Sequence, residues 1–218
     1  MQATVMLPDD RCFPDRYDGS EEAFHLIFRR VAKAMQVDSE EIEVELFGTD
    51  DDPVRELLPY YSGTTKDAAG LYYHDPTKFA RIEIHHEQLK DPLGLVATIA
   101  HELGHVILLR PGLVDGDEPK MEPLNDLLTV FLGFGVFTAN SAFQFKQYGD
   151  HKRQGWSTSR LGYLSEELFG YALARFALER GEVKPAWANF LATNVAAYFK
   201  QSTAWMKEHR ELRILSRI

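Results

Sequence analysis

Two histidines and a glutamate interrupt the apolar stretch 93–109, where residues 101–105 read His-Glu-Leu-Gly-His. Side chains four residues apart lie on one face of a helix, so His101 and His105 can bind the same metal ion if this stretch is helical. Glu102 then lies about 100° away around the helix axis, where its carboxylate can reach a water on that metal without being a ligand. The spacing therefore predicts a metal site with a neighbouring base.

The flanking residues predict a helix from Pro92 to Leu109. Asp91 is a suitable N-cap, Pro92 fits the first helical position, and Arg110 followed by Pro-Gly ends the helix. A buried helix with ordinary hydrogen bonds is the alternative interpretation. Three polar groups inside an apolar helix are costly unless something uses them, which favours the metal site. Zinc suits it, because zinc accepts neutral imidazole and tolerates an open fourth position.

A third ligand is expected downstream, and Glu122 is the leading candidate. Glu122 and Asp126 are four residues apart and share a face if they are helical. Pro123 is tolerated only in the first turn, so this second helix is predicted to begin near Pro119, with Glu122 in its first turn. The rival ligands are Asp115, Asp117 and Glu118.

With these residues the chain resembles the gluzincins, the thermolysin-like zinc metallopeptidases, over residues 101–126. The resemblance implies that Glu122 is the third zinc ligand and that Asp126 orients His101. Asn125 stands where the motif usually has Ser. The metzincin extension, a Gly and then a His soon after the motif, is absent from residues 106–111.

The resemblance also implies a reaction, which is hydrolysis of a peptide bond with one Zn²⁺ per chain and Glu102 as the general base. Gluzincins usually take a transition-state donor from the second lobe, and no motif selects one here. The candidates are His151, Arg160, Tyr163 and Tyr171. Two other hypotheses are a zinc-binding protein that recognises a partner without cleaving it, and a metal-free helical protein with a chance match.

The residues before the motif predict one helix, capped by Ser20, and then three strands. The strands are expected at 42–47, 70–73 and 81–86. This order is similar to that of the N-terminal lobe of zincins, where the strand before the active-site helix often forms an edge that pairs with substrate. The third strand is our candidate for that edge. His85 and His86 alternate in direction, so at most one of them lines the cleft.

The residues after the motif predict a mostly helical region. The helix with Glu122 is expected to continue through the apolar run 127–137, stop at 138–141, and lead into a loop at 144–155. A further helix is expected from 164 to about 180, ended by Gly181, and a last one from Pro185.

The predicted fold class is α+β and zincin-like. A small mixed lobe with a short sheet (1–110) and a mostly helical lobe (111–218) would flank a cleft.

Composition limits the possible partners. The net charge of −9 over 218 residues argues against nucleic acid, so the expected partner is a peptide or protein substrate. Cys12 is the single cysteine, so a metal site must use His and carboxylate. The N-terminus lacks the pattern of a signal peptide, and no apolar run is expected to reach membrane-spanning length. These features predict a cytoplasmic protein.

Overall fold

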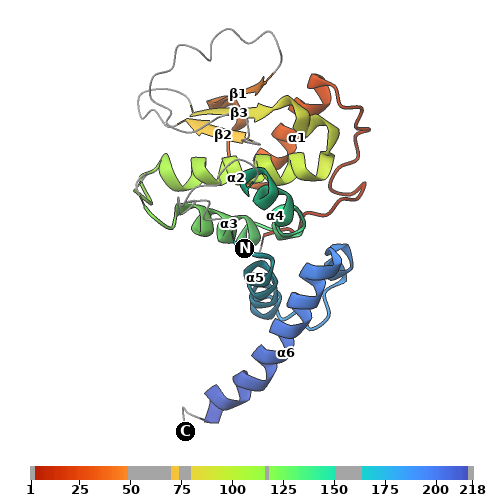
Figure 1. Ribbon diagram of the computed structural model, residues 1–218, viewed down its shortest axis with the longest axis vertical. Coiled ribbons are helices and arrows are strands. Elements are labelled where there is room, and N and C mark those ends of the chain that lie inside the picture. The colour runs from red at the N-terminus through yellow and green to blue at the C-terminus, as the bar shows by residue number, and fades with distance from the viewer. Residues whose placement is uncertain (1–2, 49–69, 74–79, 116–117, 151–163, 216–218) are drawn as a thin grey trace.

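The computed structural model describes residues 3–48, 70–73, 80–115, 118–150 and 164–215. The described part is a mixed α/β structure that is mostly helical (Figure 1). Its helices are α1 (Glu21–Ala34), α2 (Pro92–Leu109), α3 (Met121–Phe131), α4 (Gly135–Asp150), α5 (Glu166–Glu179) and α6 (Thr193–Leu215). Its strands are β1 (Ile42–Phe47), β2 (Gly70–Tyr73) and β3 (Ala80–His85).

The three strands form one sheet in the order β1-β3-β2. β3 pairs in parallel with β1 and antiparallel with β2, so that Val44 and Tyr72 both lie opposite Ile82. The prediction that the third strand is the sheet edge is therefore wrong. β3 lies in the middle because β1 and β2 pair with its two edges, and its side chains are buried on both faces, including Ile84 on one face and Glu83 on the other. Among the described strands, β2 is the edge that lies against α2.

α2 is the central helix of the fold, and its predicted bounds are confirmed. The Asp91 side chain accepts hydrogen bonds from the amides of Leu93 and Gly94, and Pro92 occupies the first turn. Figure 1 shows α2 between the sheet and the α3–α4 layer. Apolar residues cover most of the helix, which explains its burial on nearly all sides. They pack into a first core with α1, the sheet and the start of α4.

α2 is also the one described helix that is long and apolar enough to cross a membrane by length and composition. The expectation that no apolar run reaches that length is thus wrong for α2. However, 78% of the window is buried inside the protein, and the core helix of a protein in water passes the same test. The finding is weak evidence for a membrane span.

α3 and α4 are separate helices, although one continuous helix through residue 137 was predicted. α3 ends because Gly133 has a φ of +95°. The N-terminal segment crosses at this point, where the amide of Met6 donates to the carbonyl of Gly133 at 2.9 Å. A Cβ at position 133 would lie 2.1 Å from the carbonyl oxygen of Thr4, so only glycine fits.

α4 extends to Asp150, past the predicted stop at 138–141 and into the predicted loop. The polar side chains there do not end the helix, because they are used inside the protein. Thr138 is buried and lies 3.1 Å from the hydroxyl of Thr129 on α3. The hydrogen bond between these two hydroxyls ties α3 to α4.

A second core joins α4 to α5 and α6. α5 confirms its prediction, with Ser165 as N-cap and Gly181 in the left-handed region just after its end. The last helix begins at Thr193, later than the predicted Pro185, because residues 186–190 form a short 3-10 helix. That turn buries Trp187, whose indole N–H donates to Glu182.

The two cores do not divide at residue 110. Phe134 and Phe137 pack in the first core, while Leu7 packs in the second. The division into lobes 1–110 and 111–218 stays a prediction.

Candidate metal centre

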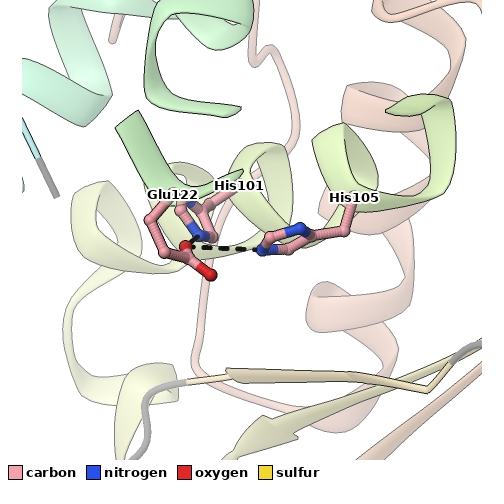
Figure 2. A group of neighbouring side chains, drawn as sticks. All are labelled: His101, His105 and Glu122. Carbon is pink, nitrogen blue, oxygen red and sulfur yellow. Dashed lines mark hydrogen bonds and ion pairs between the residues drawn. The ribbon is translucent and has the colours of Figure 1, made fainter. Parts of the chain in front are cut away.

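His101 and His105 of α2 converge on Glu122 of α3 (Figure 2). The Glu122 Oε2 atom lies 2.9 Å from His101 Nε2 and 3.5 Å from His105 Nε2. One donor atom from each of the three residues lies within 4.8 Å of the other two. Both histidines are buried, and Glu122 is partly exposed in the first turn of α3, as predicted. This group is the one of its kind among the described residues.

The geometry of this group fits a zinc ion. Zinc bonds to imidazole nitrogen and carboxylate oxygen at about 2.0–2.2 Å in a tetrahedron, which places neighbouring ligand atoms about 3.3 Å apart. The two nitrogen–oxygen distances, 2.9 and 3.5 Å, bracket that value. Two imidazoles and one carboxylate also form a donor set used at catalytic zinc sites. The residues present therefore suit zinc.

Asp126 fixes the orientation of the His101 ring. Its Oδ1 atom lies 3.1 Å from His101 Nδ1, which leaves Nε2 facing Glu122. Its Oδ2 atom accepts a hydrogen bond from the backbone amide of Leu164 at 2.8 Å. Asp126 is buried, so both oxygens are used within the protein. The residue thus lies where the resemblance places the orienting aspartate.

The electrostatics of the group follow from these contacts. Burial lowers the pKa of His101, but the hydrogen bonds to Asp126 and Glu122 outweigh it and hold that pKa well above its ordinary value. Burial raises the pKa of Glu122, but the hydrogen bonds to His101 and His105 prevail and hold it well below its ordinary value. A metal cation bound to these residues would displace protons from the imidazoles and balance the charge of the carboxylate.

Glu102 lies beside the ligand group rather than within it. Burial raises the pKa of its carboxyl, and the nearby His101 and His105 partly oppose this effect. β2 packs directly against it, since a Cβ at Gly70 would lie 2.8 Å from Glu102 Oε1. On the same face of β2, the Tyr72 ring stacks on His105 with centroids 6.0 Å apart.

Sequence reasoning did not assign Gly70 and Tyr72 to the site. Their spacing of two residues does place them on one face of the predicted strand, and this was the available signal. The sequence did not show that this face would meet the helix with the histidines, because that depends on strand order.

Two of the three rival ligands lie outside the ligand group. Asp115 and Glu118 are exposed and outside the ligand group, and Glu118 accepts a hydrogen bond from the amide of Lys120. Asp117 lies outside the described residues. His85 ends β3, but His86 begins a short 3-10 helix, so the predicted alternation of these two histidines along one strand is wrong. Their rings stack on each other, and His86 Nδ1 lies 3.3 Å from the carbonyl oxygen of Phe47.

Three of the four candidate transition-state donors, His151, Arg160 and Tyr163, lie outside the described residues. The fourth, Tyr171, is exposed on α5, with its ring 6.3 Å from that of Trp205 on α6. No contact joins Tyr171 to the ligand group within the described ranges.

Comparison of the chain with protein-family models, curated proteins and solved structures finds no match. Interpretation of the site therefore depends on its own residues. The strongest of these observations is the convergence of two histidines and a glutamate from the consecutive helices α2 and α3.

Proposed function

We propose that this protein is a zinc-dependent peptidase of the gluzincin type, with a zincin-like fold and a substrate cleft between its two lobes. One Zn²⁺ would be held by His101, His105 and Glu122. The observation that carries the proposal is the convergence of these donors, with Glu102 beside them and outside the ligand set. A purely structural zinc site would have no use for a buried carboxylate at that place.

Zinc, when bound, supplies Lewis acidity that activates water as a nucleophile and polarises a carbonyl. The protein supplies the proton transfers. Glu102 takes the proton of the attacking water and then gives it to the leaving amine. Burial favours this role because it raises the pKa of Glu102 above its ordinary value, so the carboxylate is a stronger base. Asp126 keeps the His101 ring in place throughout.

The substrate proposed is an extended peptide laid along β2. Among the described strands, β2 pairs with β3 alone, and the peptide would add as a further strand beside it. Gly70 and Tyr72 face α2 from this strand. A peptide beside them would bring its backbone near Glu102, where the reaction takes place.

The test is the Glu102→Gln variant, which keeps the size and polarity of the side chain but cannot accept the proton. We expect wild-type protein loaded with zinc to cleave members of a mixed peptide library at neutral pH, and a chelator to abolish the cleavage. Glu102→Gln should lose roughly 100-fold or more of the activity while keeping zinc and fold. Glu118→Gln is the matched control, because Glu118 is exposed and outside the ligand group.

Other outcomes would contradict the proposal in different ways. Equal cleavage by both proteins would remove Glu102 from the mechanism. Wild-type protein that binds zinc but cleaves no peptide would support a binding protein instead. Protein that stays zinc-free after reconstitution would exclude both.

A further inference from the structure

Asn125 is fully buried between α3 and α2. It follows Glu122 by three residues and precedes Asp126, and its side chain points at the histidine helix. The Nδ2 atom donates a hydrogen bond to the backbone carbonyl of His101 at 2.8 Å. The Oδ1 atom is buried and accepts no hydrogen bond from the described residues. An unpaired buried acceptor is costly, so Asn125 calls for a physical explanation.

Gly104 provides the space that this side chain occupies. A Cβ at position 104 would lie 1.9 Å from Asn125 Oδ1 and 3.0 Å from its Cγ. Any larger residue would force the two helices apart or expel the amide. Glycine inside a helix is itself destabilising relative to alanine. The unpaired acceptor of Asn125 and the glycine at position 104 are each destabilising. Where they meet, they allow α2 and α3 to approach closely.

The contact acts on the residue at the centre of the ligand group. α3 holds His101 at three atoms: Glu122 at Nε2, Asp126 at Nδ1 and Asn125 at the backbone oxygen. The first two bonds depend on ring rotation, whereas the third fixes the backbone of α2 against α3. The distance of the Glu122 carboxylate from both histidines therefore depends on how close to α2 the Asn125 side chain can lie.

We propose that Gly104 and Asn125 form an interhelical key, a pair of positioning residues that sets the separation of α2 and α3 and so makes Glu122 a zinc ligand. This inference rests on the proposed function, because it assumes the same three ligands. It adds that the identity of residue 104 controls the strength of the third ligand. Neither residue touches the metal.

The test is a double-mutant cycle with zinc itself as the probe. Gly104→Ala should weaken zinc binding by at least about 10-fold, the lower range for partners outside the ligand shell. Asn125→Ala should have a smaller effect, because it leaves space instead of a clash. The double variant Gly104→Ala/Asn125→Ala should bind zinc more tightly than Gly104→Ala alone, since the obstacle is gone. Affinity would be measured by competition with a chelator.

A second cycle separates positioning from simple stability. In the wild type, Glu122→Ala should cost more zinc affinity than any other change in α3. In the Gly104→Ala background the same change should cost at least about 10-fold less, because Glu122 is already displaced. The spectrum of bound Co²⁺ should also change in Gly104→Ala and recover in the double variant. A merely structural role would leave both readouts unchanged.

Each result supports or overturns the interhelical key. If Gly104→Ala fails to fold while the double variant folds, the key is supported by that rescue. A double variant no better than Gly104→Ala, or a Glu122→Ala cost that is the same in both backgrounds, would overturn it. Urea unfolding of the metal-free proteins reports the coupling without zinc. If wild-type protein binds no zinc, the proposed function fails, and this unfolding cycle still shows whether residues 104 and 125 are coupled.

Discussion

α2 and α3 both supply ligands to the candidate metal centre, but different forces hold the two helices. α2 is buried along almost its whole length, capped by Asp91 and packed mainly by apolar residues. α3 has no side-chain cap, and its outward face exposes Leu124, Leu127 and Phe131. Its inward face is tied to α2 through polar side chains.

The difference shows that two kinds of force build this site, one placing the helices and the other placing the donor atoms. Apolar packing is strong but has little directional preference, so it can fix the place of a helix without fixing each donor atom. Hydrogen bonds are weaker and directional. α2 therefore supplies a rigid base with two ligands, and polar bonds from α3 set the fine position of the third. Changes in the apolar residues of α2 should act on global stability, and changes in the polar residues of α3 on zinc.

The largest expected effect is on the stability of α2. Leu95→Ala removes a fully buried side chain and should lower the free energy of unfolding by about 2–5 kcal/mol. Leu127→Ala on α3 is the matched control, at 45% exposed, and should change it by about 0.5 kcal/mol or less. Urea denaturation of the metal-free proteins measures both. Equal losses of unfolding free energy in the two variants would contradict the difference in burial between α2 and α3. They would mean that the outward face of α3 is covered.

The next effect concerns the third ligand. Glu122→Ala should weaken zinc binding by more than about 100-fold, beyond the range for residues outside the ligand shell, because a direct bond is lost. Glu118→Ala and Asp115→Ala should leave the affinity unchanged, since both side chains are exposed and outside the ligand group. Chelator competition measures all three. An essential Asp115 or Glu118 with a dispensable Glu122 would show that the resemblance was placed on the wrong residue.

A smaller loss is expected from Asp126→Asn, on the order of 10- to 100-fold in zinc affinity. Asp126 accepts from two donors, His101 and Leu164, with its two oxygens, and an amide has only one oxygen. One of the two bonds must therefore fail. If zinc affinity is unaffected while the unfolding free energy falls, Asp126 serves the fold rather than His101.

The smallest effect tests whether α2 can be weakened without disturbing the site. Asp91→Ala removes the N-cap and should lower the free energy of unfolding by about 1 kcal/mol. Zinc affinity should stay the same, because the cap lies several turns from His105. A parallel loss of zinc affinity would show that the base formed by α2 is less rigid than its burial implies.

The sequence predicted α2 to the residue because its signals are local. The cap, the proline and the Pro-Gly stop all lie within or beside the helix. Glu122 and Asp126 were found by spacing on a single helical face, which is also local. The resemblance then suggested their partners.

The errors concern long-range contacts. α3 ends just before Gly133, because the N-terminal segment crosses there and Thr4 lies close to Gly133. β3 lies in the middle of the sheet because β1 and β2 pair with its two edges. The sequence of a single strand does not show which strands will flank it. Thr138 looked like a helix stop, yet its hydroxyl bonds to Thr129 within the core.

The bond from the Leu164 amide to Asp126 Oδ2 gives the protein an internal reporter. This amide lies just before α5, at the start of the second core, and its acceptor also holds His101. Any change of charge on the imidazole alters the electron density on that carboxylate and therefore the shielding of the amide proton. In a ¹H–¹⁵N spectrum, the Leu164 signal should move on zinc titration together with the His101 ring signals. Its rate of exchange with deuterium would then follow occupancy of the metal centre from a position outside the ligand group.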